Sequence, residues 1–533
     1  MARTRCSSRC CASPSSPARA RRSLAGRARF LARRDGFLEG RAGAARRIIG
    51  AVRETELPPA APEARVHAFR DDALSDHDAV GIAAAIRDGS ISAAEAVEAA
   101  IERIADIEPR LHALQLADFE RAREMARTAP SGGRGALSGV PSMLKDNVNL
   151  AGQPTTRGSL AVPARPVRHT DRFVEQFLGV GLVPLGKSRL PEFGFNASTE
   201  FAASEPTRNP WHLDYSAGAS SGGAAALVAS GALPIAHAND GGGSIRIPAA
   251  ACGLVGLKAS RGRMRTEPVQ DALPVRIISD GVVARSVRDV VAFHADAERV
   301  FRNNALPPIG HIRAPGEQRR RIGIVMDSVV GHATDPETRS AVRATADLLA
   351  SLGHHVDDAT LPVGPGFARD FVHYWGMLSV ILTAPGRWMH GREFNRARLD
   401  PLTLGLAQRY WREAYRSPAT LRRLRGTSAV VQEWFEPWDI VLSPVVGHTT
   451  PPIGYLSPNH PFEELIERLQ TYVSFTPINN AAGNPAISLP AGTTSDGRPI
   501  GVQLSAPLGD ERVLLEIAME LEQARPWRRI QDD

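Results

Sequence analysis

Three consecutive glycines stand directly before a serine near the middle of this chain. The segment from residue 239 to residue 248 reads Asn-Asp-Gly-Gly-Gly-Ser-Ile-Arg-Ile-Pro. Consecutive glycines allow a tight turn in which successive backbone N–H groups point at one spot. A serine hydroxyl beside such a cluster of donors is a nucleophile beside an oxyanion hole. The segment therefore carries the parts needed for acyl transfer.

Lysine is rare in this chain, although basic residues are common. Only Lys145, Lys187 and Lys258 are lysines among the 64 basic residues. Arginine keeps its proton in proteins, whereas a buried lysine can be neutral and act as a base. Because arginine occupies almost every other basic position, the three lysines are candidates for positions that arginine cannot fill.

Two further motifs match known active-site patterns. Residues 181–188 match the P-loop pattern of nucleotide-binding proteins. Their loop positions read Leu-Val-Pro-Leu, which favours a strand, so we expect Lys187 to end a strand and pair locally. Residues 218–222 match the nucleophile elbow of α/β-hydrolases, in which a histidine would activate Ser220. Several histidines follow, so an esterase of this class stays open as an alternative.

Several motifs, taken together and in order, resemble those of the amidase signature family of serine hydrolases. The resemblance runs from about residue 76 to residue 525. Within it, residues 207–211 and 236–240 are most similar to the 6-aminohexanoate cyclic-dimer hydrolase subgroup. The motifs that carry the family resemblance lie at residues 139–146, 216–223, 239–248, 252–258, 485–490 and 496–503.

The resemblance implies a Ser–cis-Ser–Lys triad and no metal or organic cofactor. Ser244 would be the nucleophile, Ser220 the bridging serine after a cis peptide bond, and Lys145 the general base. A neutral lysine would take the proton of the nucleophile through the bridging serine, and the acyl-enzyme would then be hydrolysed. The remaining implied site residues are the oxyanion donors Gly241, Gly242, Gly243 and Ser244 and the supporting residues Ser221 and Asp240.

The sequence departs from the family pattern at three positions. Ala219 stands where a glycine usually precedes the bridging serine, Asn239 replaces a common threonine, and Gly241 replaces a threonine or isoleucine. We expect the last two to leave the oxyanion loop more flexible. We expect Arg246 to pair with Asp240 and brace this loop.

The residues outside these motifs have structural interpretations. We expect Lys258 to be structural and Cys252 to be a small core residue. Aromatic residues between positions 374 and 415 fit a hydrophobic core, and a contribution to the acyl pocket is a hypothesis for them.

The elements that must position this chemistry follow an α/β pattern. Ser92 and Glu95 form a capping box after a C-capping Gly89, and an apolar face recurs at the spacing of a helix. Short apolar strands then alternate with helical stretches. We predict one large α/β domain over residues 71–530, with a mixed central sheet flanked by helices. Its predicted strands include Leu182–Leu185, Ile322–Val325, Ile440–Leu442 and Ala486–Leu489.

Composition excludes several other classes of protein. The chain has 533 residues, of which 43% are hydrophobic and 23% charged, an ordinary globular balance. It has no apolar stretch of about 18 residues, so we expect no membrane span. The net charge of +7 arises in residues 1–50, which hold 13 arginines and two acids. The remainder is mildly acidic, which argues against nucleic-acid binding.

The N-terminal residues 1–70 form a separate, basic segment. They are rich in arginine, alanine and serine and poor in acids. We expect this tail to be disordered. Its composition fits a targeting segment and equally fits translation from a mis-assigned start.

The sequence thus predicts a cytoplasmic amidase that hydrolyses a small-molecule carboxylic amide to an acid and an amine or ammonia. The sequence is also compatible with a homodimer. The alternatives are an A-type subunit of glutamyl-tRNA amidotransferase and the histidine-dependent esterase.

Overall fold

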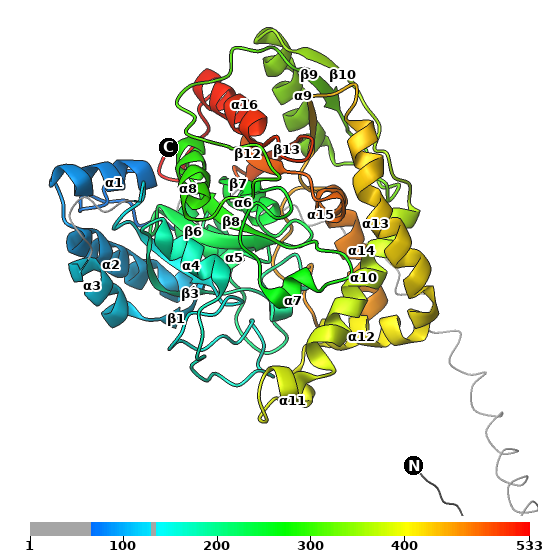
Figure 1. Cartoon of the computed structure of the whole chain (residues 1–533), viewed down its shortest axis with the longest axis horizontal. Helices are drawn as coiled ribbons and strands as arrows, with labels where there is room; N and C mark the ends of the chain where they lie inside the picture. The colour runs from blue at the N-terminus through cyan, green and yellow to red at the C-terminus, as the bar shows by residue number, and fades with distance from the viewer. Residues whose placement is uncertain (1–64, 129–134, 533) are drawn as a thin grey trace, which may run out of the picture. The chain divides into compact units, whose positions relative to one another are not determined.

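The computed structural model of the chain describes residues 65–128 and 135–532 (Figure 1). Most of the predicted tail, residues 1–64, lies outside the described residues. The described part of that tail packs against the domain, because Val66 and Ala68 are buried and donate backbone hydrogen bonds to Pro210 and Ser230. Residues 65–70 therefore belong with the domain, and the predicted boundary at residue 70 lies too far along the chain.

Helices and strands alternate along most of the domain, as predicted. The helices are α1 (Ala79–Asp88), α2 (Ala93–Leu111), α3 (Phe119–Thr128), α4 (Arg172–Gly179), α5 (Gly222–Ala229), α6 (Arg246–Cys252), α7 (Pro268–Asp271), α8 (Val287–Val300), α9 (Pro336–Ser351), α10 (Gly366–Thr383), α11 (Gly386–Met389), α12 (Pro401–Glu413), α13 (Ser417–Trp434), α14 (Phe462–Tyr472), α15 (Pro477–Ala482) and α16 (Glu511–Ala524). Short 3-10 turns occupy Glu192–Gly194, Arg396–Arg398 and Ala414–Arg416.

The strands form three sheets, the largest of which is mixed. Eight strands pair in the order β10-β9-β11-β13-β12-β7-β8-β6, with β10, β9 and β11 parallel and the other neighbours antiparallel. A second sheet has the order β1-β3-β2, and β4 pairs with β5. The strands are β1 (Leu114–Ala117), β2 (Pro141–Lys145), β3 (Val183–Ser188), β4 (Arg208–Asn209), β5 (His212–Ser216), β6 (Ile235–Asp240), β7 (Val255–Lys258), β8 (Ser279–Ala284), β9 (Arg321–Ile324), β10 (His355–Asp358), β11 (Ile440–Pro444), β12 (Ala486–Thr493) and β13 (Pro499–Ser505).

The local sequence signals explain these elements. The capping box of Ser92 and Glu95 is present at the start of α2, and Gly89 ends α1 with φ of 81°. Strands β6, β7 and β8 are buried along their whole length, and they combine small and apolar residues with polar ones such as His237, Asn239 and Asp280. The prediction of an α/β domain with a mixed sheet is confirmed.

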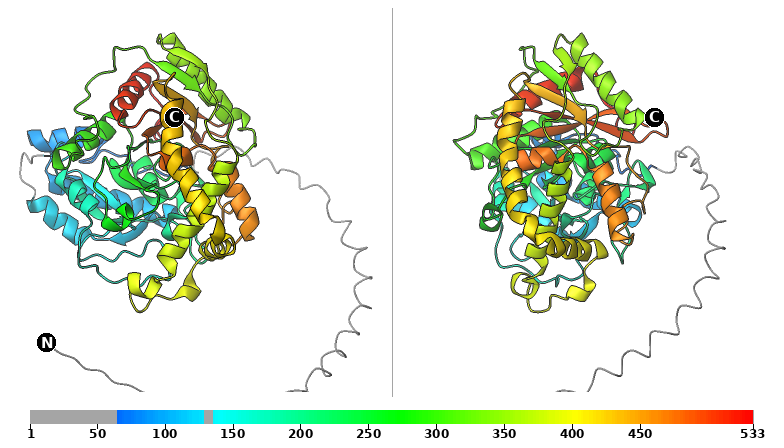
Figure 2. Two further views of the ribbon diagram at one scale, coloured as in Figure 1. Left: turned by 45° about the vertical axis from the view of Figure 1, so that its right-hand side comes forward. Right: turned by 90° about the vertical axis from the view of Figure 1, so that its right-hand side faces the viewer.

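Helices cover the sheets. A group of them on one side of the domain, here called the helical flank, consists of α10, α12, α13 and α14. In Figure 1 the long helices α10 and α13 lie beside α12 and α14, away from α1, α2 and α3. Figure 2 shows the same helices from two other sides, and α10 contacts both α12 and α13. Among the described residues, no helix combines the length and the apolar character needed to cross a bilayer.

The two main sheets meet where β2 lies against β6, the edge strand of the larger sheet. Ser142 Oγ donates a hydrogen bond to Ile235 O at 2.9 Å, and Lys145 N donates to His237 Nδ1 at 3.1 Å. These contacts set the register between the strands. As a result, the C-terminal end of β2 lies beside the C-terminal end of β6.

Candidate active site

Lys145 is the last residue of β2, and its side chain is fully buried. Its ammonium nitrogen Nζ lies 2.7 Å from Ser220 Oγ, 2.9 Å from Ser221 Oγ and 2.7 Å from Asn239 Oδ1. The two serines precede α5, and Asn239 lies near the end of β6. Three segments that are distant in sequence therefore meet at one lysine.

The environment of Lys145 favours its neutral form. Burial lowers the pKa of its side chain to about 7, although the nearby carboxylates of Asp280 and Asp240 act in the opposite direction. A substantial fraction of this lysine is therefore an uncharged amine at neutral pH. Such an amine has a lone pair and can accept a proton.

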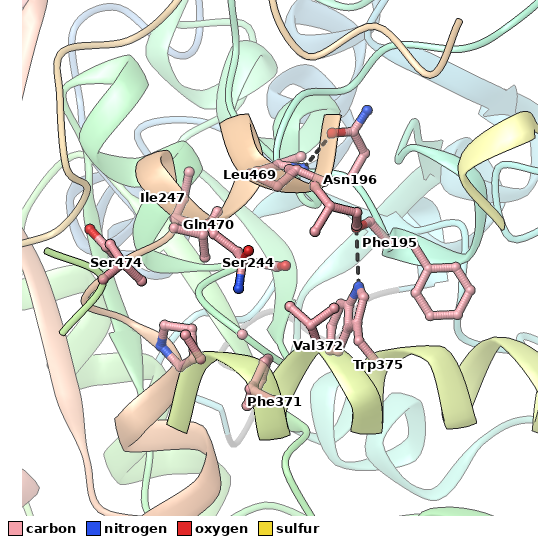
Figure 3. A pocket seen from close by; sticks show the side chains of 18 of the residues that line it. Phe195, Asn196, Ser244, Ile247, Phe371, Val372, Trp375, Leu469, Gln470 and Ser474 are labelled. Carbon is pink, nitrogen blue, oxygen red and sulfur yellow. Dashed lines mark hydrogen bonds between the residues drawn. The ribbon is translucent and has the colours of Figure 1, made fainter. Parts of the chain in front are cut away.

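Ser220 and Ser244 lie on different segments of the same site. The peptide bond between Ala219 and Ser220 is cis, as the resemblance implied. Ser244 lines a pocket together with Ala219 and Gly242 (Figure 3). The Ser244 hydroxyl has no hydrogen-bond partner among the described residues, and 8% of the residue is exposed. It faces the space that a substrate would enter.

The glycine loop follows β6 directly and is held by Asp240. The Gly243 N–H donates to Asp240 Oδ1 at 2.7 Å, and the Ile245 N–H donates to Asp240 Oδ2 at 3.2 Å. This geometry differs from the sequence prediction, since the Gly243 N–H is engaged and is not free to bind an oxyanion. The amides of Gly241, Gly242 and Ser244 donate to no residue in the described part of the chain.

Asp240 itself is part of a buried network. Both Asp240 and Arg246 are fully buried, and two guanidinium nitrogens contact the carboxylate at 2.9 Å. Burial opposes ionisation of Asp240, but the charge and hydrogen bonds of Arg246 hold its pKa well below the usual range. The predicted brace is confirmed. Arg246 also donates to three side-chain carbonyls that the sequence analysis did not identify, those of Asn479, Asn480 and Gln503.

Further contacts hold the loop from the side of the helical flank. Thr476 Oγ1 donates to Gly242 O at 2.6 Å. A Cβ placed on Gly241 would lie 3.4 Å from Trp375, and one on Gly242 would lie 3.4 Å from Phe371. The aromatic rings of α10 thus pack directly against the glycine loop. This close packing restricts the loop, whereas the sequence predicted that it would be more flexible.

A histidine–aspartate pair lies behind Lys145. Because His237 Nδ1 accepts from the Lys145 amide, its Nε2 carries the proton and donates to Asp280 Oδ1 at 3.3 Å. Burial lowers the pKa of His237, so the ring is neutral. This pair was not predicted from the sequence, although a histidine beside small apolar residues was a visible signal.

Other singled-out residues lie outside this cluster. Lys187 belongs to β3, donates to Val148 O and Thr155 Oγ1, and lies 3.8 Å from Asp146, so residues 181–188 form no phosphate loop. Lys258 donates to two backbone carbonyls, and Cys252 is a buried core residue.

No histidine donates to or accepts from Ser220 or Ser244 within residues 65–128 and 135–532. The same ranges contain no group of three His, Cys, Asp or Glu side chains placed to hold a metal ion.

Comparison with known proteins places this site in a family. The family model described as Amidase matches residues 95–515. A Mycobacterium bovis protein named as amidase AmiC is 49% identical over 467 residues, which cover 87% of this chain and 98% of the relative. The 6-aminohexanoate-cyclic-dimer hydrolase of a Pseudomonas species is 36% identical over 84% of this chain and 95% of its own length.

Solved structures agree with the sequence matches. The structure of 6-aminohexanoate cyclic dimer hydrolase superposes with a TM-score of 0.78 at 33% identity, covering 87% of this chain and 99% of the other. The fold and the sequence matches define an enzyme of the amidase signature class. The chain belongs to the amidase family, and it is an enzyme that hydrolyses amides.

Proposed function

We propose that this chain hydrolyses small-molecule carboxylic amides through an acyl-enzyme on Ser244, with Ser220 as the bridging serine and Lys145 as the base. One observation carries the proposal. A fully buried lysine, whose pKa is lowered to about 7, contacts the hydroxyl of Ser220 at 2.7 Å beside the pocket that Ser244 lines. The cytoplasmic location and a homodimeric state remain predictions.

The three contacts of Lys145 suggest which way the proton moves. A neutral amine offers two N–H donors and one lone pair. Asn239 Oδ1 can only accept, and the Ser221 hydroxyl donates to Asn239 O at 3.4 Å, so Ser221 accepts from the amine. The lone pair then remains for the hydroxyl of Ser220. Ser220 can pass its proton to Lys145 while it takes the proton of Ser244.

The remaining steps follow from this relay. Ser244 attacks the amide carbonyl, and the oxyanion is bound by the free amides of Gly241, Gly242 and Ser244. The protonated Lys145 returns the proton through Ser220 to the departing nitrogen, and an amine or ammonia leaves. Water then takes the same path to hydrolyse the ester on Ser244. Each proton leaves and returns through one lysine.

The two alternatives, the histidine-dependent esterase and the amidotransferase subunit, make different demands on the protein. The esterase would need a histidine at Ser220, and in the described residues that hydroxyl is paired with Lys145. An A-type amidotransferase subunit would use ammonia only with its partner subunits. The similarity to a hydrolase of cyclic dimers makes cyclic or linear aliphatic amides the first substrates to assay.

The proposal is tested by assaying the isolated chain, without ATP or any partner, for ammonia released from hexanamide. We expect turnover by the wild type and a loss of about 10³-fold or more in Ser244→Ala, because the nucleophile is removed. Turnover that requires ATP, or that persists in Ser244→Ala, would refute the proposal.

The pH dependence provides a separate prediction. Because protonated Lys145 cannot act as a base, kcat/KM should fall about tenfold per unit below pH 7 and level off above it. Asp280→Asn removes a negative charge that favours the ammonium form, so the midpoint should move to lower pH by roughly one unit. Measured profiles of both proteins check this. Asp439→Asn, which removes a half-buried carboxylate paired with Arg321, is the control. An unmoved midpoint in Asp280→Asn would count against the assignment.

A further inference from the structure

The pocket beside Ser244 has no ionisable group on its walls. Its lining comes from the segment 194–197, from α10, from α14 and from the residues around Ser244. None of the described lining residues is Lys, Arg, His, Asp or Glu. A charged substrate group would lose its hydration here without gaining a partner. The pocket therefore disfavours binding of substrates that carry a charged group.

Aromatic side chains of α10 form one wall of this pocket. Phe371 and Trp375 are stacked with ring centroids 5.6 Å apart, and the Trp375 indole N–H donates to Phe195 O at 3.1 Å. Figure 3 shows both rings rising from α10 toward Ser244. Because the indole N–H is already bonded, this wall offers a substrate apolar surface and no free donor.

The polar side chains that line the pocket differ in whether they are free to form hydrogen bonds with a substrate. Asn196 is engaged, since its Nδ2 donates to Leu456 O and its Oδ1 accepts from the Ala197 amide. The buried Ser474 hydroxyl has no hydrogen-bond partner in the part of the chain that the structure describes, and it lies close to Gly447, where a Cβ would be 3.0 Å away. Figure 3 shows this hydroxyl turned away from Ser244.

Unlike Asn196 and Ser474, Gln470 has a polar group that is free and faces the pocket. It is half-buried on α14, and its carboxamide bonds to no residue in the described ranges. Figure 3 shows it projecting into the space that Ser244 also faces. A free carboxamide can donate to a carbonyl and accept from an N–H at the same time. It is suited to a neutral amide and not to a carboxylate.

We propose that the substrate has an uncharged, apolar acyl chain that carries a second neutral hydrogen-bonding group, such as another amide, and that Gln470 binds this second group. The inference rests on the proposed function, because it takes Ser244 as the acylated residue. It adds the substrate class, a neutral amide with a second polar group, and the residue that recognises it.

Three substrates of similar length separate the alternatives. Hexanamide ends in a methyl group, hexanediamide ends in a second amide, and 5-carbamoylpentanoate ends in a carboxylate. We expect wild-type kcat/KM to be at least 100-fold lower for 5-carbamoylpentanoate than for hexanediamide. Comparable values for these two, or no turnover of either neutral amide, would overturn the inference.

Two substitutions test the role of Gln470. Gln470→Leu should lower kcat/KM for hexanediamide about tenfold relative to hexanamide. Gln470→Lys places a positive charge in the pocket and should raise the relative kcat/KM for 5-carbamoylpentanoate at least tenfold, a gain that misfolding cannot produce. The exposed Glu467 on the same helix supplies the control Glu467→Gln, which should leave both ratios unchanged.

Unchanged ratios in both Gln470 variants would refute the assignment of this residue. Ser244→Ala is assayed in parallel on the same substrates. Turnover that survives Ser244→Ala would refute the proposed catalytic role, whereas charge-insensitive turnover that Ser244→Ala abolishes would refute only the inference about the pocket.

Discussion

Replacing Lys145 by methionine is expected to lower kcat/KM for a neutral amide by about 10³-fold, within the range of about 10²–10⁴ that general bases contribute. Methionine preserves the length and apolar stem of the side chain but cannot accept the proton of Ser220. The oxygens of Ser221 and Asn239 that accept from Nζ would also lose their donor. Steady-state kinetics on purified wild type and variant measure the effect.

The matched control is Lys258→Met. Lys258 is also fully buried, and burial likewise lowers the pKa of its side chain to about 7. Within the described residues, however, it donates only to the backbone carbonyls of Ala259 and Asn484. We expect this variant to lose stability and to keep kcat/KM within a few fold. Equal losses of activity in the two variants would mean that Lys145 acts only through the fold.

Asp240→Asn is expected to destabilise the protein by about 3–5 kcal/mol, because it leaves the fully buried Arg246 without a counter-charge. Asp240 also holds the amides of Gly243 and Ile245, so the glycine loop should loosen. We expect kcat/KM of the folded variant to fall by about 10²-fold, the loss seen when an oxyanion donor is misplaced. Denaturant unfolding and steady-state kinetics measure the two effects.

A surface ion pair serves as the comparison for this variant. Asp327 pairs with Arg339 at the surface, where its side chain is 65% exposed. Asp327→Asn should cost less than about 1 kcal/mol and leave activity intact. If Asp240→Asn were as mild as Asp327→Asn, the buried pair would not be what holds the loop.

Much of the site could be predicted because its parts are close in sequence. The glycine loop, Asp240 and Arg246 lie within seven consecutive residues, so their association follows from one turn after a strand. The start of α2 was predictable for the same reason, since the capping box spans four residues. Local patterns of this kind encode local geometry directly.

The rest depends on contacts between distant segments. The interaction of Asn239 with Lys145 exists because β2 lies against β6, and a departure from a family pattern does not reveal that contact. The engagement of the Gly243 amide depends on the rotation of one carboxylate. The packing of Trp375 on the glycine loop requires α10, more than 100 residues away in sequence. None of these has a local signature.

The proposed triad is tested by labelling the protein with a fluorophosphonate serine probe and mapping the adduct by mass spectrometry in wild type and Lys145→Met. If Lys145 activates Ser244, an adduct forms on Ser244 in the wild type and does not form in Lys145→Met over the same time. An adduct on Ser220 that forms equally in both proteins would contradict the proposed triad.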